Sequence, residues 1–178
     1  MTPRIPLRWN CPYYLIEISP AQKNRRFPRS FEFVLEDFPM TVQTDVIQFP
    51  TKGHSDILDI TNEVVMSVQQ AGLRNGTVTI FSPSATSSVT TIEHEAGCLH
   101  DLRRLFDEIV DPDRDYAHNA RWGDGNGHSH VRAALLGASL CVPFVDGRLT
   151  LGTWQQIIFI DFDNRPRRRE LVLQIMGE

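Results

Sequence analysis

The chain has 178 residues, of which 41% are hydrophobic and 22% are charged, and these values are typical of one globular domain with a sizeable core. Its formal net charge of −4 argues against a general nucleic-acid binder, because binding to a phosphate backbone rests on an excess of Lys and Arg. The sequence contains no run of about 18 apolar residues, the length that a membrane span requires.

The cysteine content indicates a reducing compartment. Cys11, Cys98 and Cys141 are odd in number, lie far apart and form no C-x-x-C pair, so they suit neither a disulfide framework nor a thiolate zinc site. The first residues also lack the apolar stretch of a signal peptide. We therefore expect a cytoplasmic protein.

Two parts of unequal length are predicted. Residues 1–40 are expected to be an extension that packs on the main body, since five prolines within the first 30 residues break any periodicity. Residues 41–178 are expected to form the main domain. Alternation from Phe31 to Glu36, followed by the apolar residues of 42–49, predicts one or two strands across this boundary.

The next elements alternate between helix and strand. Apolar residues three and four apart predict a helix over residues 61–72, with Thr61 as its N-cap. Strands are predicted over residues 77–82 and 85–92. A second amphipathic helix over residues 99–109 is expected to end at Pro112, which disfavours helix in the residue before it.

Residues 113–127 have no apolar period, and a loop of about fifteen residues inside a compact domain is usually functional or disordered. Its Tyr116, His118 and Trp122 favour function. A third helix over 130–138 and strands over 140–145, 157–162 and 170–176 complete the chain. These elements predict an α+β domain, with a small antiparallel sheet and two or three flanking helices.

Three of the six histidines fall between residues 118 and 130. Imidazole is a common ligand of zinc-like metals and titrates near neutral pH. His118, His128 and His130 are therefore a candidate metal site, with zinc or magnesium as the expected divalent ion and His130 as a candidate catalytic group. The alternative is that these imidazoles are solvated, because positions i and i+2 of a regular helix do not face each other.

The same segment could instead bind an anion. Glycines precede a helix start there, and the free N–H groups of a helix N-terminus suit a phosphate or a carboxylate. Asn126 and Arg132 are candidate substrate-binding residues for such a group, with Arg132 able to pair with it through two hydrogen bonds.

Three further residues carry polar or aromatic chemistry. Glu93 could be a metal ligand, a general base or a charge at a helix N-terminus. Gln155 could read a substrate amide or orient a water, and Trp154 could form a wall for a flat ring or lie in the core. The arginines of 165–169 are interpreted as a solvated hairpin tip or a subunit contact.

Three stretches of the sequence resemble the YjbQ-like family, whose members are often described as secondary thiamine-phosphate synthases. They are GTVTIFSPSATSSVTTIEHE, YAHNARWGDGNGHSHVRAALLGASLCVPFVDGRLTLGTWQQI and FDNRPRRRELVLQIMGE. The resemblance extends from about Val42 to the last residue. It implies an α+β fold of antiparallel sheet with flanking helices, a homotrimer or a larger ring such as a hexamer, and a polar cleft in which a metal has been suggested.

The resemblance also assigns positions. His118, His130, Glu93 and the pair Trp154-Gln155 correspond to polar and aromatic positions of the family pattern. Many members carry a histidine in the threonine-rich strand where this chain has Ser84, which becomes a candidate substrate-binding residue. His128 could replace the lost imidazole in space, or this branch could have changed its activity.

Two functions remain open. The first is an enzyme that acts on a small phosphorylated metabolite, as the family name implies. The second is a non-enzymatic, homo-oligomeric protein that binds a metal or another ligand. Neither requires a nucleic acid or a membrane as partner.

Overall fold

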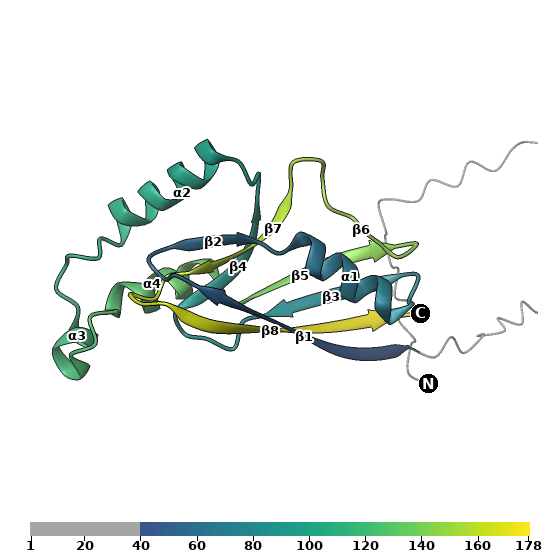
Figure 1. Ribbon diagram of the computed structural model, residues 1–178, viewed down its shortest axis with the longest axis horizontal. Coiled ribbons are helices and arrows are strands. Elements are labelled where there is room, and N and C mark those ends of the chain that lie inside the picture. Colours follow the sequence, from purple (N-terminus) through teal and green to yellow (C-terminus); the bar gives the residue numbers. More distant parts are fainter. Residues whose placement is uncertain (1–39) are drawn as a thin grey trace, which may run out of the picture. The chain divides into compact units, whose positions relative to one another are not determined.

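The computed structural model describes residues 40–178, and within them the chain is an α+β domain (Figure 1). The predicted extension and the strand expected near Phe31 lie outside the described residues, except for Met40. The strands are β1 (Thr41–Thr51), β2 (Asp56–Asp59), β3 (Gly76–Phe81), β4 (Ser87–Ile92), β5 (Ser139–Val145), β6 (Arg148–Leu149), β7 (Gln156–Asp161) and β8 (Arg167–Gly177). The helices are α1 (Thr61–Ala71), α2 (Ala96–Ile109), α3 (Ala117–Trp122) and α4 (Gly127–Leu136).

Most predicted elements are confirmed with small shifts of their ends, and three predictions are wrong. The expected loop of 113–127 contains α3, so the described domain has four helices. Helix α4 begins at Gly127, three residues before the predicted start. Thr61 does not cap α1, because its hydroxyl donates to Asp59 Oδ1 (2.6 Å) and accepts from the Ile157 N–H (2.9 Å).

The strands form two antiparallel sheets. The five-stranded sheet has the order β1-β8-β3-β5-β6, and the three-stranded sheet has the order β2-β7-β4. In the second sheet, Ser87 of β4 pairs with Asp161 of β7, and Ile92 pairs with Gln156. The strands β5 and β6 are joined at Asp146-Gly147, where both residues have positive φ (49° and 71°), as a two-residue hairpin turn of type I′ requires.

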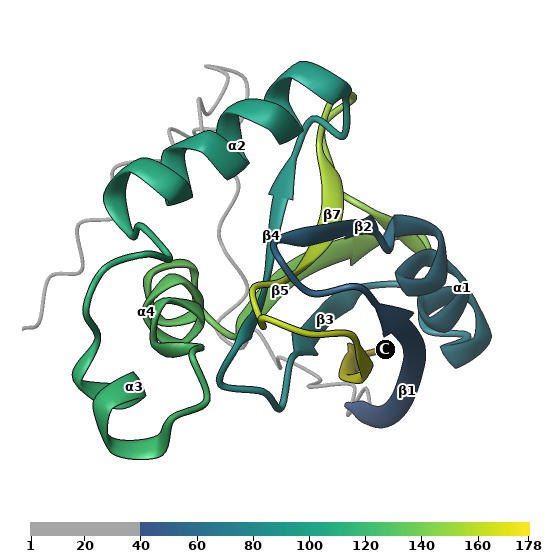
Figure 2. The ribbon, with the colours of Figure 1, turned by 60° about the vertical axis from the view of Figure 1, so that its left-hand side comes forward.

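The three-stranded sheet is covered on both faces, which explains the continuous apolar run of β7. Ile157 and Phe159 pack in a core with α1 and the five-stranded sheet. Ile158 and Ile160 point to the opposite face, into a second core with Phe106 of α2 and Ala133 of α4. Figure 2 shows α2 and α4 on one side of β4 and β7, with β1, β3 and α1 on the other.

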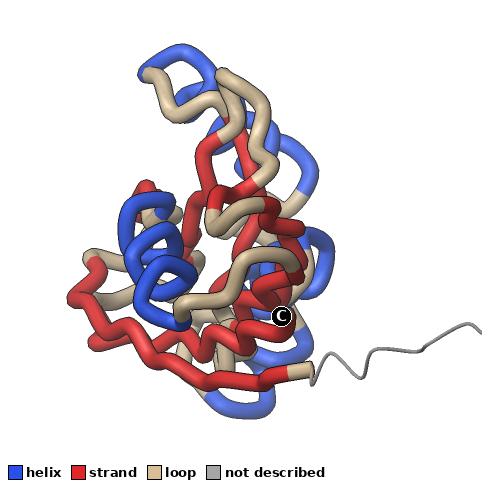
Figure 3. The backbone as a smooth tube through the Cα atoms, turned by 90° about the vertical axis from the view of Figure 1, so that its right-hand side faces the viewer, coloured by secondary structure: helices blue, strands red, loops and turns tan. Residues whose placement is uncertain are grey.

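The outer face of the five-stranded sheet is not covered within the described chain. Successive strand residues alternate between faces, and the register brings one set of exposed apolar residues to this face. They are Val42, Val46, Phe81, Val145 and Met176, which are 39–55% exposed. In Figure 3 the helices lie around the periphery of the strands. No helix within residues 40–178 is both long and apolar enough to cross a membrane.

Candidate functional site

The start of α4 is fixed by its contacts with α3. The Gly127 N–H donates to Asn119 Oδ1 (2.8 Å), which satisfies one of the free donors of the first helical turn. A Cβ on Gly127 would lie 2.5 Å from Tyr116 Cβ, so only glycine fits this close approach. Gly123 ends α3 in the left-handed region (φ 69°), and this turn returns the chain to α4.

Helix α3 thereby brings His118 against His130. The centroids of the two imidazole rings are 4.4 Å apart. His118 Nε2 lies 3.1 Å from Asp124 Oδ2, and the Asn126 amide nitrogen, when it faces this carboxylate, donates to it at 3.1–3.2 Å. Asp124 and Asn126 therefore orient His118, and two of the three histidines predicted as ligands of one ion, His118 and His130, lie side by side.

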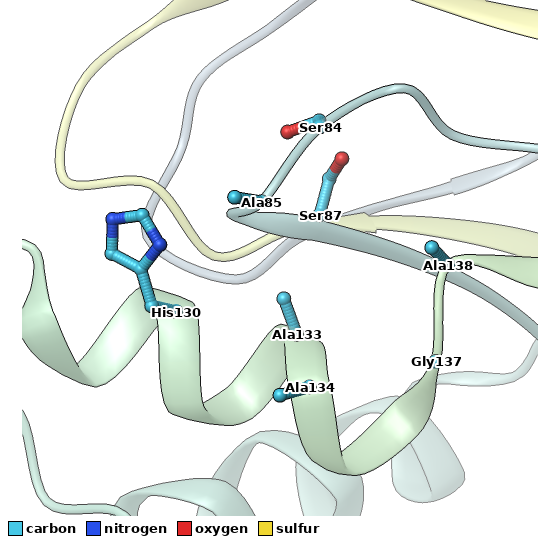
Figure 4. Close-up of a pocket in the computed structure, with 8 residues that line it drawn as sticks. All are labelled: Ser84, Ala85, Ser87, His130, Ala133, Ala134, Gly137 and Ala138. Atoms are coloured by element: carbon cyan, nitrogen blue, oxygen red, sulfur yellow. The ribbon is translucent and has the colours of Figure 1, made fainter.

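His130 lines a pocket of about 350 Å³ between α4 and the loop that joins β3 to β4 (Figure 4). Ser84 and Ser87 come from the β4 side of this pocket, and Figure 4 shows the Ser84 hydroxyl and the His130 ring directed toward the same space. The remaining walls are formed by alanine and glycine residues, whose small size leaves the volume open. Neither ring nitrogen of His130 hydrogen-bonds to another described residue, so both remain free for a ligand.

Ser84 is held by a buried network of ion pairs between the two sheets. Arg169 Nη1 donates to Ser84 Oγ (2.8 Å), and the same guanidinium binds Asp161 Oδ1 (2.5 Å) and Oδ2 (2.8 Å). Asp161 is fully buried, and the Arg169 side chain is only 12% exposed. The Thr86 N–H also donates to Ser84 Oγ (3.2 Å). Because both lone pairs of Ser84 are used, its O–H must donate. Its partner among the described residues is Thr86 Oγ1 at 3.5 Å, which is long for a hydrogen bond, so a ligand in the pocket can accept this O–H instead.

The same network includes Asp163, which accepts from Arg167 Nε (2.8 Å) and from Arg169 Nη2 (3.3 Å). Burial raises the pKa of the Asp163 carboxyl, but the Arg167 hydrogen bond and charge outweigh burial and hold its pKa below the ordinary value.

The interpretation of these arginines as a solvated tip is wrong for Arg167 and Arg169. The strand pattern could have indicated this, because Arg167 and Arg169 are spaced by two residues from the buried Leu171, Leu173 and Ile175 of β8 and so lie on the same face.

His128 and Arg132 lie on the other face of α4. A helix turns about 100° per residue, so positions 128 and 132 point away from position 130 and its pocket. Arg132 is 3% exposed and donates to Val110 O, Ser55 Oγ and Asp107 Oδ1. It therefore joins α4 to α2 and to the turn before β2, and it does not reach the pocket of His130.

The residues do not fit the predicted metal site of three imidazoles. His118 and His130 meet, whereas His128 faces the opposite side of α4. Within residues 40–178, no three His, Cys, Asp or Glu side chains are arranged as ligands of one ion.

Glu93, Trp154 and Gln155 lie at the far end of the β4–β7 pair. The pair of Ile92 with Gln156 lies five residue steps along the strands from the pair of Ser87 with Asp161. This separation is about 17 Å at the usual rise per strand residue. Trp154 is 70% exposed, so the core alternative for this residue is wrong. Gln155 closes its own loop, since Oε1 accepts from the Gly152 N–H (3.1 Å) and Nε2 donates to Thr91 Oγ1 (3.0 Å).

Glu93 is exposed, and the cap of α2 comes from its neighbour. The Glu95 carboxylate accepts from the N–H groups of Gly97 and Cys98, and these hydrogen bonds lower the pKa of Glu95. The residues predicted for one site thus form separate groups within a single chain, and only His118, Asn126, Ser84 and His130 belong to the group at α4.

Comparison with known proteins places the chain in one family. The family described as UPF0047 protein YjbQ-like matches residues 45–178. A UPF0047 protein of Methanothermobacter thermautotrophicus is 37% identical over 139 residues, covering 78% of this chain and 95% of the relative. The UPF0047 protein YugU of Bacillus subtilis is 34% identical, with 74% and 97% covered.

Solved structures show the same fold for similar sequences. A YbjQ-like protein from Sulfolobus solfataricus P2 superimposes with a TM-score of 0.75 at 34% identity, covering 78% of this chain and 99% of that one. A hypothetical protein from Aeropyrum pernix K1 gives 0.71 at 32% identity, with 76% and 99% covered. The chain, which pairs His118 with His130 beside a pocket backed by buried ion pairs, is a member of the UPF0047 YjbQ-like family.

Proposed function

We propose that the pocket of His130 is the active site of an enzyme that acts on a small phosphorylated metabolite. The observation that carries this proposal is the pairing of two donors across one pocket. The His130 imidazole has no hydrogen bond to a described residue, and the Ser84 O–H faces it with both lone pairs of the oxygen already used. Two converging donors suit the oxygens of a phosphate or diphosphate group.

The roles follow from these positions. In a reaction of the thiamine-phosphate type, a thiazole nitrogen displaces diphosphate from a pyrimidine carbon, and negative charge grows on the leaving oxygen. His130 in its protonated form donates to that oxygen as a general acid, and Ser84 donates a second hydrogen bond. The His118 ring lies against the His130 ring in a tilted arrangement and is oriented by Asp124. The charges of the network behind Ser84 cancel, because two arginines face two aspartates.

The test compares two histidine variants with the wild-type protein. His130→Ala is expected to lower turnover of the pyrimidine diphosphate and thiazole phosphate precursors by about 10²- to 10⁴-fold, the usual contribution of a general acid. His100→Ala, at an exposed position of α2, is the matched control and is expected to keep full turnover. Circular dichroism and melting temperature check that both variants fold. Unchanged turnover in His130→Ala would remove His130 from the mechanism.

The second candidate is a homo-oligomeric protein that binds a ligand without converting it. The exposed apolar face of the five-stranded sheet favours assembly, because exposed apolar patches mark protein contacts when they are contiguous. We propose that this face joins copies of the chain into a trimer or hexamer. Light scattering of Phe81→Glu is expected to show a smaller particle than the wild-type protein. A monomeric wild-type protein would contradict assembly through this face.

A further inference from the structure

A second pocket, of about 220 Å³, lies on the face of α4 opposite to His130. The turn before β2, helix α2 and helix α4 each contribute to it, and it shares no lining residue with the pocket of His130. Its polar lining residues are His54, Ser55, Arg103, Asp107, His128 and Arg132. The volume is below the roughly 300–1,000 Å³ of pockets for drug-sized ligands, so it suits a small one.

The charges in this pocket leave one guanidinium without a counter-ion. Arg132 is neutralised by Asp107, whose Oδ1 lies 2.8 Å from Nη2. The half-buried Arg103 donates from Nε to Ser55 O (3.2 Å), and its two Nη groups bond to no residue within 40–178. The Nη pair of a guanidinium forms a fork that matches the oxygens of a phosphate or carboxylate.

The turn that closes the pocket is strained. Gly53, His54 and Ser55 have consecutive positive φ values of 72°, 54° and 59°, a backbone conformation that is unfavourable for the two non-glycine residues. Arg103 binds the carbonyl of Ser55 and Arg132 binds its hydroxyl. The two arginines therefore hold the turn in place, and strain of this kind concentrates at ligand sites.

His128 is 7% exposed, and its ring nitrogen Nδ1 is buried without a hydrogen-bond partner among the described residues. Ser129 Oγ donates its single proton to Phe162 O (2.6 Å), so the 3.3 Å contact with His128 Nε2 requires that the imidazole donates. Nδ1 is then an acceptor, and it has no donor among the described residues. Burial, followed by the Arg132 charge, lowers the pKa of His128, which keeps the ring neutral.

We propose that this pocket binds a small phosphate-type oxyanion, which Arg103 holds through its two Nη groups and whose O–H donates to His128. Inorganic phosphate near neutral pH carries such an O–H, and a phosphate monoester carries one in its monoanionic form, whereas sulfate and carboxylates do not. The oxyanion is either free inorganic phosphate or the phosphate group of a metabolite. This site is separate from the pocket of His130 and goes beyond the function proposed for it.

The test is calorimetric titration of inorganic phosphate into the full chain, in buffer free of phosphate and sulfate. Arg103→Gln is expected to weaken binding roughly 10- to 100-fold, as the loss of a charged hydrogen bond does. Arg104→Gln is the matched control, because Arg104 is the next residue of α2 and, among residues 40–178, makes only exposed ion pairs with Asp101 and Glu108. It is expected to bind phosphate as the wild-type protein does.

Two further variants separate the possible outcomes. Arg103→Lys keeps the charge but loses the fork, so it is expected to bind phosphate with intermediate affinity, and melting temperatures confirm that each variant folds. His130→Ala is expected to bind phosphate unchanged, so failure of the proposed catalysis would leave this result intact.

Displacement by glycerol phosphate would assign the site to a phosphorylated metabolite, and its failure would assign it to free phosphate. Either result supports the shared chemistry. Absence of binding to the wild-type protein, equal loss in Arg103→Gln and Arg104→Gln, or equally tight binding of sulfate would each overturn the proposal.

Discussion

Replacing Arg169 by methionine tests whether the ion network between the sheets stabilises the domain. Arg169 donates five hydrogen bonds, to both oxygens of Asp161 and to Asp163, Ser84 and Thr86. Methionine keeps a similar apolar stem but supplies no donor. Among the described residues, the Asp161 side chain, which is 0% exposed, would then keep only its hydrogen bonds from Thr51 and the Asp163 N–H.

The expected cost follows from this burial. Removing one partner of a buried ion pair leaves an uncompensated charge and costs about 3–5 kcal/mol. That is a large part of the roughly 5–15 kcal/mol that stabilises a native domain. For a chain of this size, the melting temperature is expected to fall by roughly 6–20 °C, at about 2–4 °C per kcal/mol.

Urea unfolding followed by circular dichroism measures the free energy of unfolding. Arg168→Met is the matched control, because Arg168 is exposed on the other face of β8 and its side chain bonds, within the described part of the chain, only to Gln48 Oε1 (3.0 Å). Its cost is expected to stay within about 0.5 kcal/mol. The double variant Arg169→Met/Asp161→Asn is expected to recover part of the loss, since it also removes the buried charge. Equal costs for the two arginine variants would refute the reasoning.

Three other predictions concern single positions. Gly127→Ala is expected to cost about 1–3 kcal/mol in urea unfolding, although alanine favours helices, because its Cβ would overlap Tyr116; a stabilised variant would contradict this packing. Because the pKa of Asp163 is lowered in the native state, its ionised carboxylate stabilises that state. This stabilisation is present above the unfolded pKa of about 3.9 and is lost as the pH falls from that value through the lower native pKa. Asp163→Asn is therefore expected to flatten the pH dependence of unfolding in that acidic range. Trp154→Ala is expected to change the free energy of unfolding by no more than about 0.5 kcal/mol, since Trp154 is exposed; a loss of several kcal/mol would indicate a packed indole.

Elements with a strong local signal could be predicted from the sequence. The apolar run of β7, the amphipathic α1 and α2 and the Asp146-Gly147 turn each carry their own periodicity or turn chemistry. Helix α3 could not be found in this way, because it is six residues long and has no buried face to impose a period. The early start of α4 depends on Asn119 and Tyr116 of α3, so it was also missed.

The sequence alone determined the family and the fold class, since these rest on local pattern and on family motifs. Only the tertiary structure decided which polar residues share a site. The helical turn sends His128 and Arg132 away from His130, and the register of β4 with β7 places Trp154 and Gln155 about 17 Å along the strands. Arg169 meets Asp161 only because two sheets pack face to face, and that contact between distant segments leaves no trace in either segment taken alone.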